Sequence, residues 1–448
     1  MRGSSPQYPV QKGDEILVEI SGLNHEGQGV GHYQGLTVFV PFALPEDRVV
    51  IQIEEVKSSF ARGKVLEFLN STAYRIESSC ACFEECGGCH LQHFDYRRQL
   101  AFKEEVVVNA LRRIGKFQGL KVLPIIGMKT PFAYRNKAEY PVRVVDGILK
   151  SGFFASRSHE LIVLNKTCLI QHPLVEKTRK VFMAICNQQD MKKGFLKAVL
   201  NRLMIRVGVF SGEVMLVVGS ENPVPVIEAV CERLISEMPQ VKGIFQSCGQ
   251  SFTGDRLVMG KPSIREKIGG LEFDISPDSF FQVNSAQAEV LFSKTVEYAG
   301  CEGIAVDAYC GTGSISLFLA QEAKKVYGFE VFPDAVKDAR HNAEINGIQN
   351  VEFIQGDIGV TLKKLNGVKP ETIVVDPPRR GCDEKVLQEI AGLQPEKIVY
   401  VSCNPATLAR DLKILAGTGY SIEEVQPIDM FPQTRHVEAI TLLQNEKR

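Results

Sequence analysis

The spacing of hydrophobic and polar positions changes along this chain of 448 residues. Residues 8–69 alternate Val or Ile with polar residues, as in "DEILVEISGL" and "DRVVIQIEEV", between turns such as "HEGQGVG". A period of two predicts strands with one buried face, because successive side chains point to opposite sides. The Gly- and Pro-rich turns between these short strands predict a small β-barrel.

A helical period follows the barrel. Within residues 94–124, the stretch "YRRQLAFKEEVVVNALRRIG" places Leu100, Val107 and Leu111 on roughly one face of a helix. Residues 70–93 and 125–268 mix strand and helix patterns without a repeat, and we expect them to form a central domain. We expect the 94–124 helix to pack on the C-terminal domain, residues 269–448.

Residues 269–448 show the most regular alternation of strand and helix patterns. "IAVDAYCGTGSISLFLAQEA" and "KVYGFEVFPDAVKDARHNAEING" each predict a strand, a loop and a helix in turn. Short apolar strands that alternate with helices predict a parallel sheet in a doubly wound, Rossmann-like α/β domain. The carboxyl ends of such strands meet at one edge of the sheet, so Asp307, Glu330, Asp376 and Cys403 should lie along that edge.

Composition narrows the class of protein. The formal net charge is -1, so any nucleic-acid binding must come from local basic patches. No run of 18 or more apolar residues and no secretory leader pattern occur, so we expect a cytoplasmic protein with no membrane partner. The 12 cysteines are unevenly spaced, which favours reduced thiols and a metal site over disulfides.

The first strand of the α/β domain ends in a candidate cofactor turn, "DAYCGTGSISL". Gly311 and Gly313 let the backbone approach a ligand closely. Ser316 stands where a dinucleotide fingerprint has a third glycine, so an NAD-dependent oxidoreductase is the weaker alternative. The carboxylate of Glu330 can accept both hydroxyl hydrogens of an adenosine ribose, and Asp357 can receive the adenine amino group.

"DPPRRG" follows the fourth strand. A (D/N)PP tripeptide at this place is typical of methyltransferases, and its two prolines stiffen the loop beside the reactive end of the cofactor. Enzymes that methylate exocyclic or amide nitrogens normally continue with an aromatic residue that stacks on the substrate. Arg379 stands there instead, which argues against nitrogen methylation.

Taken together, three segments identify a resemblance. "DPPRRG", then "IVYVSCNPAT" 16 residues later, and "IDMFPQTRHVE" resemble the signatures of the RNA (uracil-C5)-methyltransferase family. Residues 8–69 are similar to the TRAM domain of that family, and "CACFEECGGCHLQH" is similar to the cysteine cluster of its 23S ribosomal RNA branch. The resemblance implies a class I methyltransferase domain, S-adenosylmethionine as cofactor, 23S ribosomal RNA as substrate and no obligate protein partner.

The same resemblance assigns roles to residues. Carbon 5 of uracil is a poor nucleophile, and addition of a thiolate to C6 activates it. The family places this thiolate at Cys403 and the base that removes the C5 proton at Glu438. Cys403 precedes a predicted helix, whose N-terminus can stabilise its thiolate. Gln282 of "QVN", Tyr309 and Asp376 complete the expected cofactor contacts.

A metal site is predicted between the barrel and the helix. Cys80, Cys86 and Cys89 have C-x5-C-x2-C spacing, which is compatible with either zinc or an iron–sulfur cluster. His90 and His93 also leave a mixed zinc site open. The family resemblance adds Cys168 as the fourth ligand and selects a [4Fe-4S] cluster.

Two further hypotheses concern RNA. "FAYRNKAEYPVR" interleaves basic residues with Tyr134 and Tyr140, which predicts base stacking or a strand with a solvated charged face. Phe280 and Phe281 could stack on a flipped base or belong to the core. Two rival functions remain: a tRNA T-loop uridine methyltransferase, and a non-catalytic RNA-binding assembly factor with a methyltransferase fold.

Overall fold

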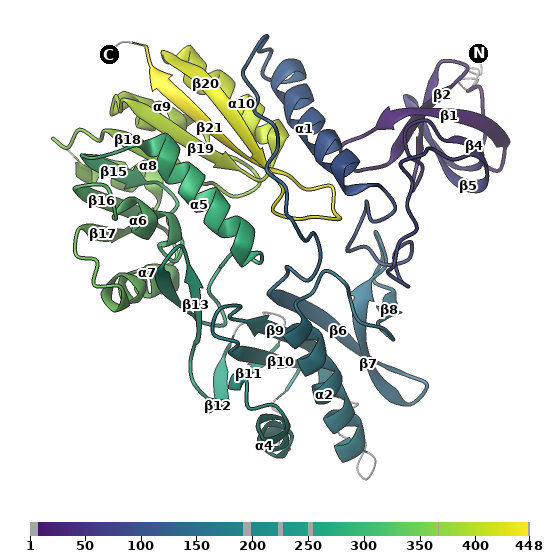
Figure 1. Ribbon diagram of the computed structural model, residues 1–448, viewed down its shortest axis with the longest axis horizontal. Helices are drawn as coiled ribbons and strands as arrows, with labels where there is room; N and C mark the ends of the chain where they lie inside the picture. Colours follow the sequence, from purple (N-terminus) through teal and green to yellow (C-terminus); the bar gives the residue numbers. More distant parts are fainter. Residues whose placement is uncertain (1–7, 191–198, 223–226, 250–253, 366, 447–448) are drawn as a thin grey trace, which may run out of the picture. The chain divides into compact units, whose positions relative to one another are not determined.

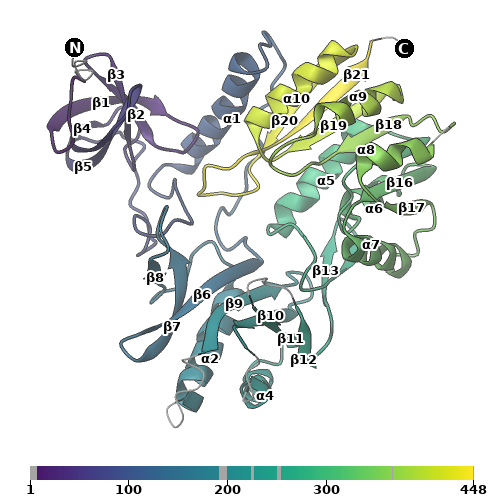
Figure 2. The same ribbon diagram turned by 180° about the vertical axis from the view of Figure 1, so that it is seen from behind.

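The computed structural model describes residues 8–190, 199–222, 227–249, 254–365 and 367–446. These residues form two compact units. The first unit contains the chain through Val106 together with residues 155–158 and 433–435, and the second contains the rest. Figures 1 and 2 show the elements of each unit from opposite sides.

A closed five-stranded barrel forms most of the first unit. Alternate residues of its strands are buried, as the period of two predicts, and fill the interior with Val and Ile. The barrel is too narrow for a side chain at Gly31, where a Cβ would lie 2.1 Å from the Val18 side chain. In spatial order the strands are β1 (Glu15–Leu23), β2 (Gly29–Tyr33), β3 (Leu36–Val40), β5 (Phe60–Asn70) and β4 (Arg48–Val56).

The buried carboxylate of Asp47 ties the barrel to the segment that follows it. Its two oxygens accept the backbone N–H groups of Leu44 and Thr72 at 2.6 and 2.9 Å, and it pairs with Arg75. Helix α1 (Tyr96–Arg113) starts in the first unit and passes into the second after Val106. Its Phe102 packs with Leu44, Leu91 and Phe94 in a small separate core.

A mixed seven-stranded sheet opens the second unit, where the mixed pattern of residues 125–268 predicts both strands and helices. Helices α2 (Pro173–Asp190) and α4 (Ile227–Glu237) pack against each other beside it. In spatial order its strands are β12 (Arg256–Gly260), β11 (Val241–Cys248), β10 (Val214–Ser220), β9 (Leu200–Val207), β6 (Lys137–Val145), β7 (Ile148–Phe154) and β8 (Leu161–Val163).

A second seven-stranded sheet contains the C-terminal strands of the chain, and it confirms the predicted α/β class. Its first five strands are parallel, and the last two run antiparallel to their neighbours. In spatial order they are β17 (Val351–Gln355), β16 (Lys325–Glu330), β15 (Ile304–Asp307), β18 (Thr372–Val375), β19 (Lys397–Ser402), β21 (Glu438–Asn445) and β20 (Tyr420–Ile428).

Helices cover both faces of this sheet. Figures 1 and 2 show α5 (Ser285–Ala299) on one face and α9 (Glu384–Gly392) with α10 (Pro405–Gly417) on the other. The chain leaves β15, β16 and β17 through α6 (Ser314–Leu319), α7 (Pro333–Ile345) and the short α8 (Ile358–Thr361) with the 3-10 turn Leu362–Leu365. This βαβ order brings the strand ends to one edge, here called the catalytic edge after the catalytic residues that the sequence predicts there.

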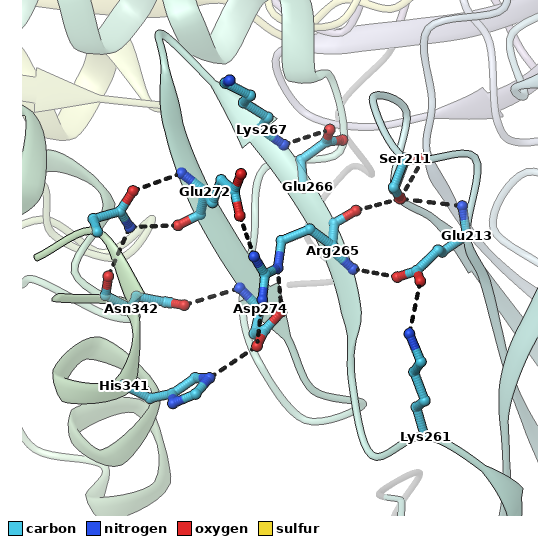
Figure 3. A network of polar contacts seen from close by, with 12 residues as sticks. Ser211, Glu213, Lys261, Arg265, Glu266, Lys267, Glu272, Asp274, His341 and Asn342 are labelled. Carbon is cyan, nitrogen blue, oxygen red and sulfur yellow. Dashed lines mark hydrogen bonds and ion pairs between the residues drawn. The ribbon is translucent and has the colours of Figure 1, made fainter. Parts of the chain in front are cut away.

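A hairpin of β13 (Ile264–Ile268) and β14 (Leu271–Ile275) joins the two sheets of the second unit through polar contacts. Figure 3 shows Arg265 paired with Glu272 and Asp274, while Asp274 also binds His341 of α7. On the other side, the buried Glu266 accepts the backbone N–H groups of residues 209 and 210 at 2.8 and 2.9 Å. The hairpin is therefore bonded to α7 on one side and to the β9–β10 turn on the other.

Candidate active site

The turn after β15 is shaped for close approach of a ligand. Gly311 and Gly313 have φ values of 52° and 85°, which side chains rarely tolerate. A Cβ at Gly313 would lie 2.9 Å from the Phe353 ring. The Glu330 carboxylate, at the end of β16, accepts the N–H of Gly311 at 3.1 Å and the N–H groups of Val331 and Phe332 at 2.7 and 2.9 Å. These bonds fix the orientation of the carboxylate beside the turn.

Two acids next to this turn have pKa values that are raised above the usual range of a carboxyl group. Burial, and next the charge of Glu330, raise the pKa of Asp307 to about 6, while the Ser316 hydroxyl donates to it at 2.7 Å. Burial and the charge of Asp307 raise the pKa of Asp376, just after β18, to about 7. A bound cation beside these acids would favour their ionised forms.

Strand pairing brings Cys403 and Glu438 together. Ser402, the last residue of β19, pairs with Ala439 in the antiparallel β21, so Glu438 begins its strand where Cys403 leaves the neighbouring one. Cys403 is partly exposed, whereas Glu438 is 6% exposed. The two residues predicted as nucleophile and base therefore meet at the catalytic edge.

The pKa values of both groups are raised in the free protein. Burial, then the charges of Glu438 and Asp376, raise the pKa of the Cys403 thiol to about 11. Burial and the charge of Asp376 raise the pKa of Glu438 well above its usual range. Burial thus outweighs the helix N-terminus expected to stabilise the thiolate. Arg379 lowers both pKa values by its charge.

Arg379 is the charged residue of the "DPPRRG" turn that acts on both Cys403 and Glu438. It is exposed, and its backbone carbonyl accepts from the side chains of Asn404 and Thr407 at 3.1 and 3.4 Å. Asn404 also caps α10, where its side-chain oxygen accepts the N–H of Ala406 at 3.1 Å. The sequence feature that could have pointed to this residue is the arginine that follows "DPP", where nitrogen methyltransferases have an aromatic residue.

Gln282 lies on a segment with one exposed and one buried aromatic ring. Its carbonyl accepts from the Asn136 side chain at 3.0 Å. Phe281 is buried against Phe273, which assigns it to the core. Phe280 is 73% exposed, and its carbonyl accepts from the Thr312 hydroxyl of the cofactor turn at 3.4 Å.

The other predicted cofactor contacts flank the turn. The Tyr309 hydroxyl bonds to the Cys382 thiol, and burial raises the pKa of the tyrosine. Asp357 is exposed after β17 and caps α8 through its backbone carbonyl, which accepts from Thr361 at 2.9 Å. Glu330, Asp376 and Asp357 thus follow three strands of the same sheet at the same edge.

The structure excludes Tyr134 and Tyr140 as stacking residues. Their side chains are 6% and 1% exposed, and each hydroxyl donates to an internal acceptor, Pro432 O at 2.9 Å and Glu176 at 2.7 Å. The strand pattern is correct, but its aromatic positions point into the core. The hypothesis that these two rings stack on RNA bases is therefore wrong.

The cysteine loop folds as a series of turns. Cys80, Cys86 and Cys89 are partly exposed cysteines in the first unit, and Cys168 is buried in the second. The N–H of Gly88 donates to the Cys86 sulfur at 3.4 Å, a contact suited to a thiolate ligand. Burial raises the pKa of Cys86 in the absence of a metal. Within the described ranges, no three His, Cys, Asp or Glu side chains are grouped to hold a metal ion.

The donor chemistry of this loop fits a thiolate cluster, whereas its side chains do not form a coordination shell in this structure. The predicted ligand set thus stays a prediction.

In the part of the chain that the structure describes, no helix combines the length and the hydrophobicity needed to cross a membrane.

Comparison with known proteins adds the family context. A family model described as tRNA (Uracil-5-)-methyltransferase matches residues 249–446, and the TRAM domain model matches residues 9–66. An uncharacterized RNA methyltransferase of Halalkalibacterium halodurans is 41% identical over 456 residues, covering 98% of this chain and 99% of that protein. One from Caldanaerobacter subterraneus is 42% identical over 451 residues, with 97% and 99% covered.

A solved structure is similar over nearly the whole chain. The Pyrococcus abyssi tRNA (uracil-54, C5)-methyltransferase, in complex with S-adenosyl-L-homocysteine, superposes with a TM-score of 0.74 at 28% identity. The match covers 96% of this chain and 100% of that one.

Proposed function

This chain belongs to the family of RNA (uracil-5-)-methyltransferases, and we propose that it methylates C5 of a uridine in 23S ribosomal RNA. It is an RNA methyltransferase with a TRAM domain, and its fold is that of an S-adenosylmethionine-dependent enzyme. The observation that carries the proposed mechanism is the pairing of β19 with β21, which places Cys403 beside Glu438 at the catalytic edge.

Cys403 acts as the nucleophile. Its thiolate sulfur forms a bond to C6 of the uracil, and the electron pair of the C5–C6 double bond becomes available at C5. When bound, S-adenosylmethionine would supply an electrophilic methyl group to C5; its sulfur–methyl bond would break and S-adenosylhomocysteine would leave as the neutral thioether. Glu438 then takes the proton from C5, the double bond re-forms, and the sulfur leaves C6 with its electron pair, so the thiolate is regenerated.

Arg379 supports the first step. Its charge lowers the pKa values of both Cys403 and Glu438, and thus favours the thiolate and the carboxylate that the reaction uses. The same cation is suited to the negative charge that develops on the uracil ring after addition of the thiolate.

The cofactor contacts proposed from the sequence are compatible with the geometry of the turn. Glu330 would accept the ribose hydroxyls, Asp357 the adenine amino group, and Gln282, Tyr309 and Asp376 would flank the methionine end. Three exposed apolar side chains add a surface for the adenine ring, which the sequence analysis did not assign: Val331, Phe332 and Val360, at 50%, 68% and 69% exposure.

Cys80, Cys86, Cys89 and Cys168 would hold the proposed [4Fe-4S] cluster. Four thiols and the N–H contact to the Cys86 sulfur support this assignment. When bound, such a cluster would supply cross-links between distant segments of the chain, since methyl transfer needs no electron. The mechanism above uses no group of the cluster.

The RNA substrate has two candidates. The cysteine loop, similar to that of the ribosomal branch, favours 23S ribosomal RNA. The Pyrococcus abyssi relative favours a tRNA uridine instead, because its structure covers 96% of this chain, including the barrel region. Presence of the barrel therefore does not by itself select ribosomal RNA.

A trapping experiment tests the function and the substrate together. Purified protein with S-adenosylmethionine is incubated with 23S rRNA fragments or tRNA transcripts that contain 5-fluorouridine, which lacks the abstractable C5 proton. We expect a covalent protein–RNA adduct on a 23S fragment and none with Cys403→Ala. Cys248→Ala, which removes another partly exposed thiol, is the matched control and should retain the adduct.

The outcomes are distinct. Adducts confined to tRNA would replace the ribosomal substrate by the second candidate. Methyl transfer by Cys403→Ala would refute the nucleophile. RNA binding without methyl transfer by the wild-type protein would favour the non-catalytic assembly factor.

A further inference from the structure

A buried carboxylate outside the catalytic edge contacts the turn that carries Arg379. Asp411 lies on α10, and its side chain is fully buried. One oxygen accepts the backbone N–H of Cys382 at 2.9 Å and the Tyr400 hydroxyl at 2.5 Å. The other accepts from the Arg410 guanidinium at 2.7 Å.

Arg410 extends the same contact to the turn. Its guanidinium also donates to the carbonyls of Arg380 and Cys382 at 3.0 and 3.2 Å. The turn itself is closed by the N–H of Gly381, which donates to Pro378 O at 2.8 Å. The hydrogen bonds of the Asp411–Arg410 pair therefore determine where residues 378–382 lie on α10.

Gly381 shows how closely the backbone of the turn approaches the Asp411–Arg410 pair. Its φ is +74°, and a Cβ at this position would lie 2.4 Å from the Asp411 carboxylate and 2.6 Å from the Arg410 guanidinium. Only glycine lets the backbone come this close to the pair. The turn is also held at Arg379. The carbonyl of Arg379 accepts from the side chain of Asn404, the residue after Cys403.

We propose that Asp411 is a positioning residue that, through Cys382, Tyr400 and Arg410, holds the 378–382 turn so that the Arg379 cation stays beside Cys403 and Glu438. The catalytic meaning of this position rests on the proposed function. Asp411 touches neither the reacting residues nor the proposed cofactor surface, and it acts through the turn alone.

The direction in which the pKa of Cys403 changes can distinguish the two ways in which Asp411 could act on it. The charged groups that act on the thiol are Glu438 of β21, Asp376 after β18 and Arg379 of the turn. Removal of the negative charge of Asp411 would by direct Coulomb interaction lower the pKa of a thiol. Displacement of Arg379 would raise it, because this cation lowers the pKa of Cys403.

The test measures alkylation of Cys403 by iodoacetamide as a function of pH in the full-length protein. The tryptic peptide 398–410 contains no other cysteine, so mass spectrometry isolates its rate from those of the remaining 11 thiols. We expect Asp411→Asn to move the pH midpoint upward by on the order of one unit. Arg379→Gln should produce a similar upward shift, and the double variant no further one.

Two variants separate positioning from loss of stability. Gly381→Ala displaces the turn but leaves the charge of Asp411, and it should give the same upward shift. Glu176→Gln is the matched control, because Glu176 is also a buried carboxylate that binds a tyrosine hydroxyl and an arginine, Tyr140 and Arg179. It should lower the melting temperature and leave the Cys403 midpoint unchanged.

An unchanged or lowered midpoint in Asp411→Asn or Gly381→Ala would overturn the proposal, as would an unchanged midpoint in Arg379→Gln. Since alkylation needs neither RNA nor cofactor, this result is independent of the proposed activity. Failure of the wild-type protein to methylate RNA would reject the function and leave the positioning result standing.

Discussion

Among single residues, Cys403 and Glu438 have side chains whose pKa values are raised in the free protein. Desolvation and the charge of Asp376 raise both pKa values, and the charge of Glu438 contributes to that of the partly exposed Cys403. A neutral thiol and a neutral acid cost less in a dry site than their ions do. The charge of Arg379 offsets part of this effect for both residues.

This arrangement predicts the pH dependence of catalysis. Since the proposed mechanism uses the thiolate and the carboxylate, and both pKa values are raised, kcat/KM should rise between about pH 7 and pH 9. The slope should approach at least about one log unit per pH unit, measured by single-turnover methylation of RNA. Arg379→Gln should move the whole profile to higher pH. A flat or falling wild-type profile would contradict the assignment of these groups.

Gly313 gives a second prediction at this scale. Its φ is +85°, and only 2.9 Å would separate an added Cβ from the Phe353 ring, so Gly313→Ala is doubly unfavourable. We expect a loss of about 2 kcal/mol in the free energy of unfolding and weaker cofactor binding, measured by urea denaturation and calorimetry.

Gly392→Ala is the control for this substitution, because no atom lies within 4 Å of its Cβ position and its φ is not positive. It should change the free energy of unfolding by less than about 0.5 kcal/mol. Equal losses for both variants would mean that the turn is not constrained as described.

At the scale of elements, the strand ends concentrate acids at one edge. Glu330 and Asp307 are the last residues of β16 and β15, and Asp376 follows β18; these three strands are neighbours in the sheet. Burial together with their proximity raises the pKa of Asp307 to about 6 and that of Asp376 to about 7. Such mutual repulsion destabilises the free fold, and a bound cationic cofactor would relieve it.

The raised pKa of Asp376 predicts a stabilising substitution. An acid whose pKa is raised in the folded state binds more protons there than in the unfolded chain, so its contribution to stability falls as the pH rises. For Asp376 this loss occurs between about pH 4 and pH 7. Relative to the wild-type protein, Asp376→Asn should therefore gain on the order of 2 kcal/mol in free energy of unfolding as the pH is raised from about 5 to about 8.

Urea denaturation of the two proteins at both pH values measures this gain. The same variant should lose methyl transfer, which would show that the carboxylate is kept for function at a cost in stability. A gain of equal size at both pH values would show that ionisation of Asp376 is not its source.

At the scale of the whole molecule, the cysteine loop and Cys168 belong to different compact units. Under the proposed ligand set, anaerobically purified protein should contain about four iron and four sulfide per chain. Cys86→Ser should lower both and reduce the melting temperature. Cys82→Ser, a change in the same loop outside the ligand set, should retain them. Stoichiometric zinc without sulfide would contradict the cluster.

Much of the fold could be predicted from local patterns. The period of two in "DRVVIQIEEV" predicts β4, and the alternation of strands with helices predicts the parallel sheet, because both depend on interactions between near neighbours in the chain. The same patterns could not tell which aromatic residues are exposed. Phe280 and Phe281 are adjacent, yet one is 73% exposed and the other 4%.

By itself, the sequence determined the class of the protein: a barrel, an α/β domain and the motif residues Cys403 and Glu438. The barrel and the α/β domain follow from periodicity, whereas Cys403 and Glu438 are what the resemblance to the methyltransferase family implies. The electrostatics of these residues came from the tertiary structure alone, since the pKa values of Cys403 and Glu438 and the contact of Asp411 with the 378–382 turn depend on burial and on contacts between distant segments. Electrostatic energies depend on distance in space, which the order of residues along a chain does not contain.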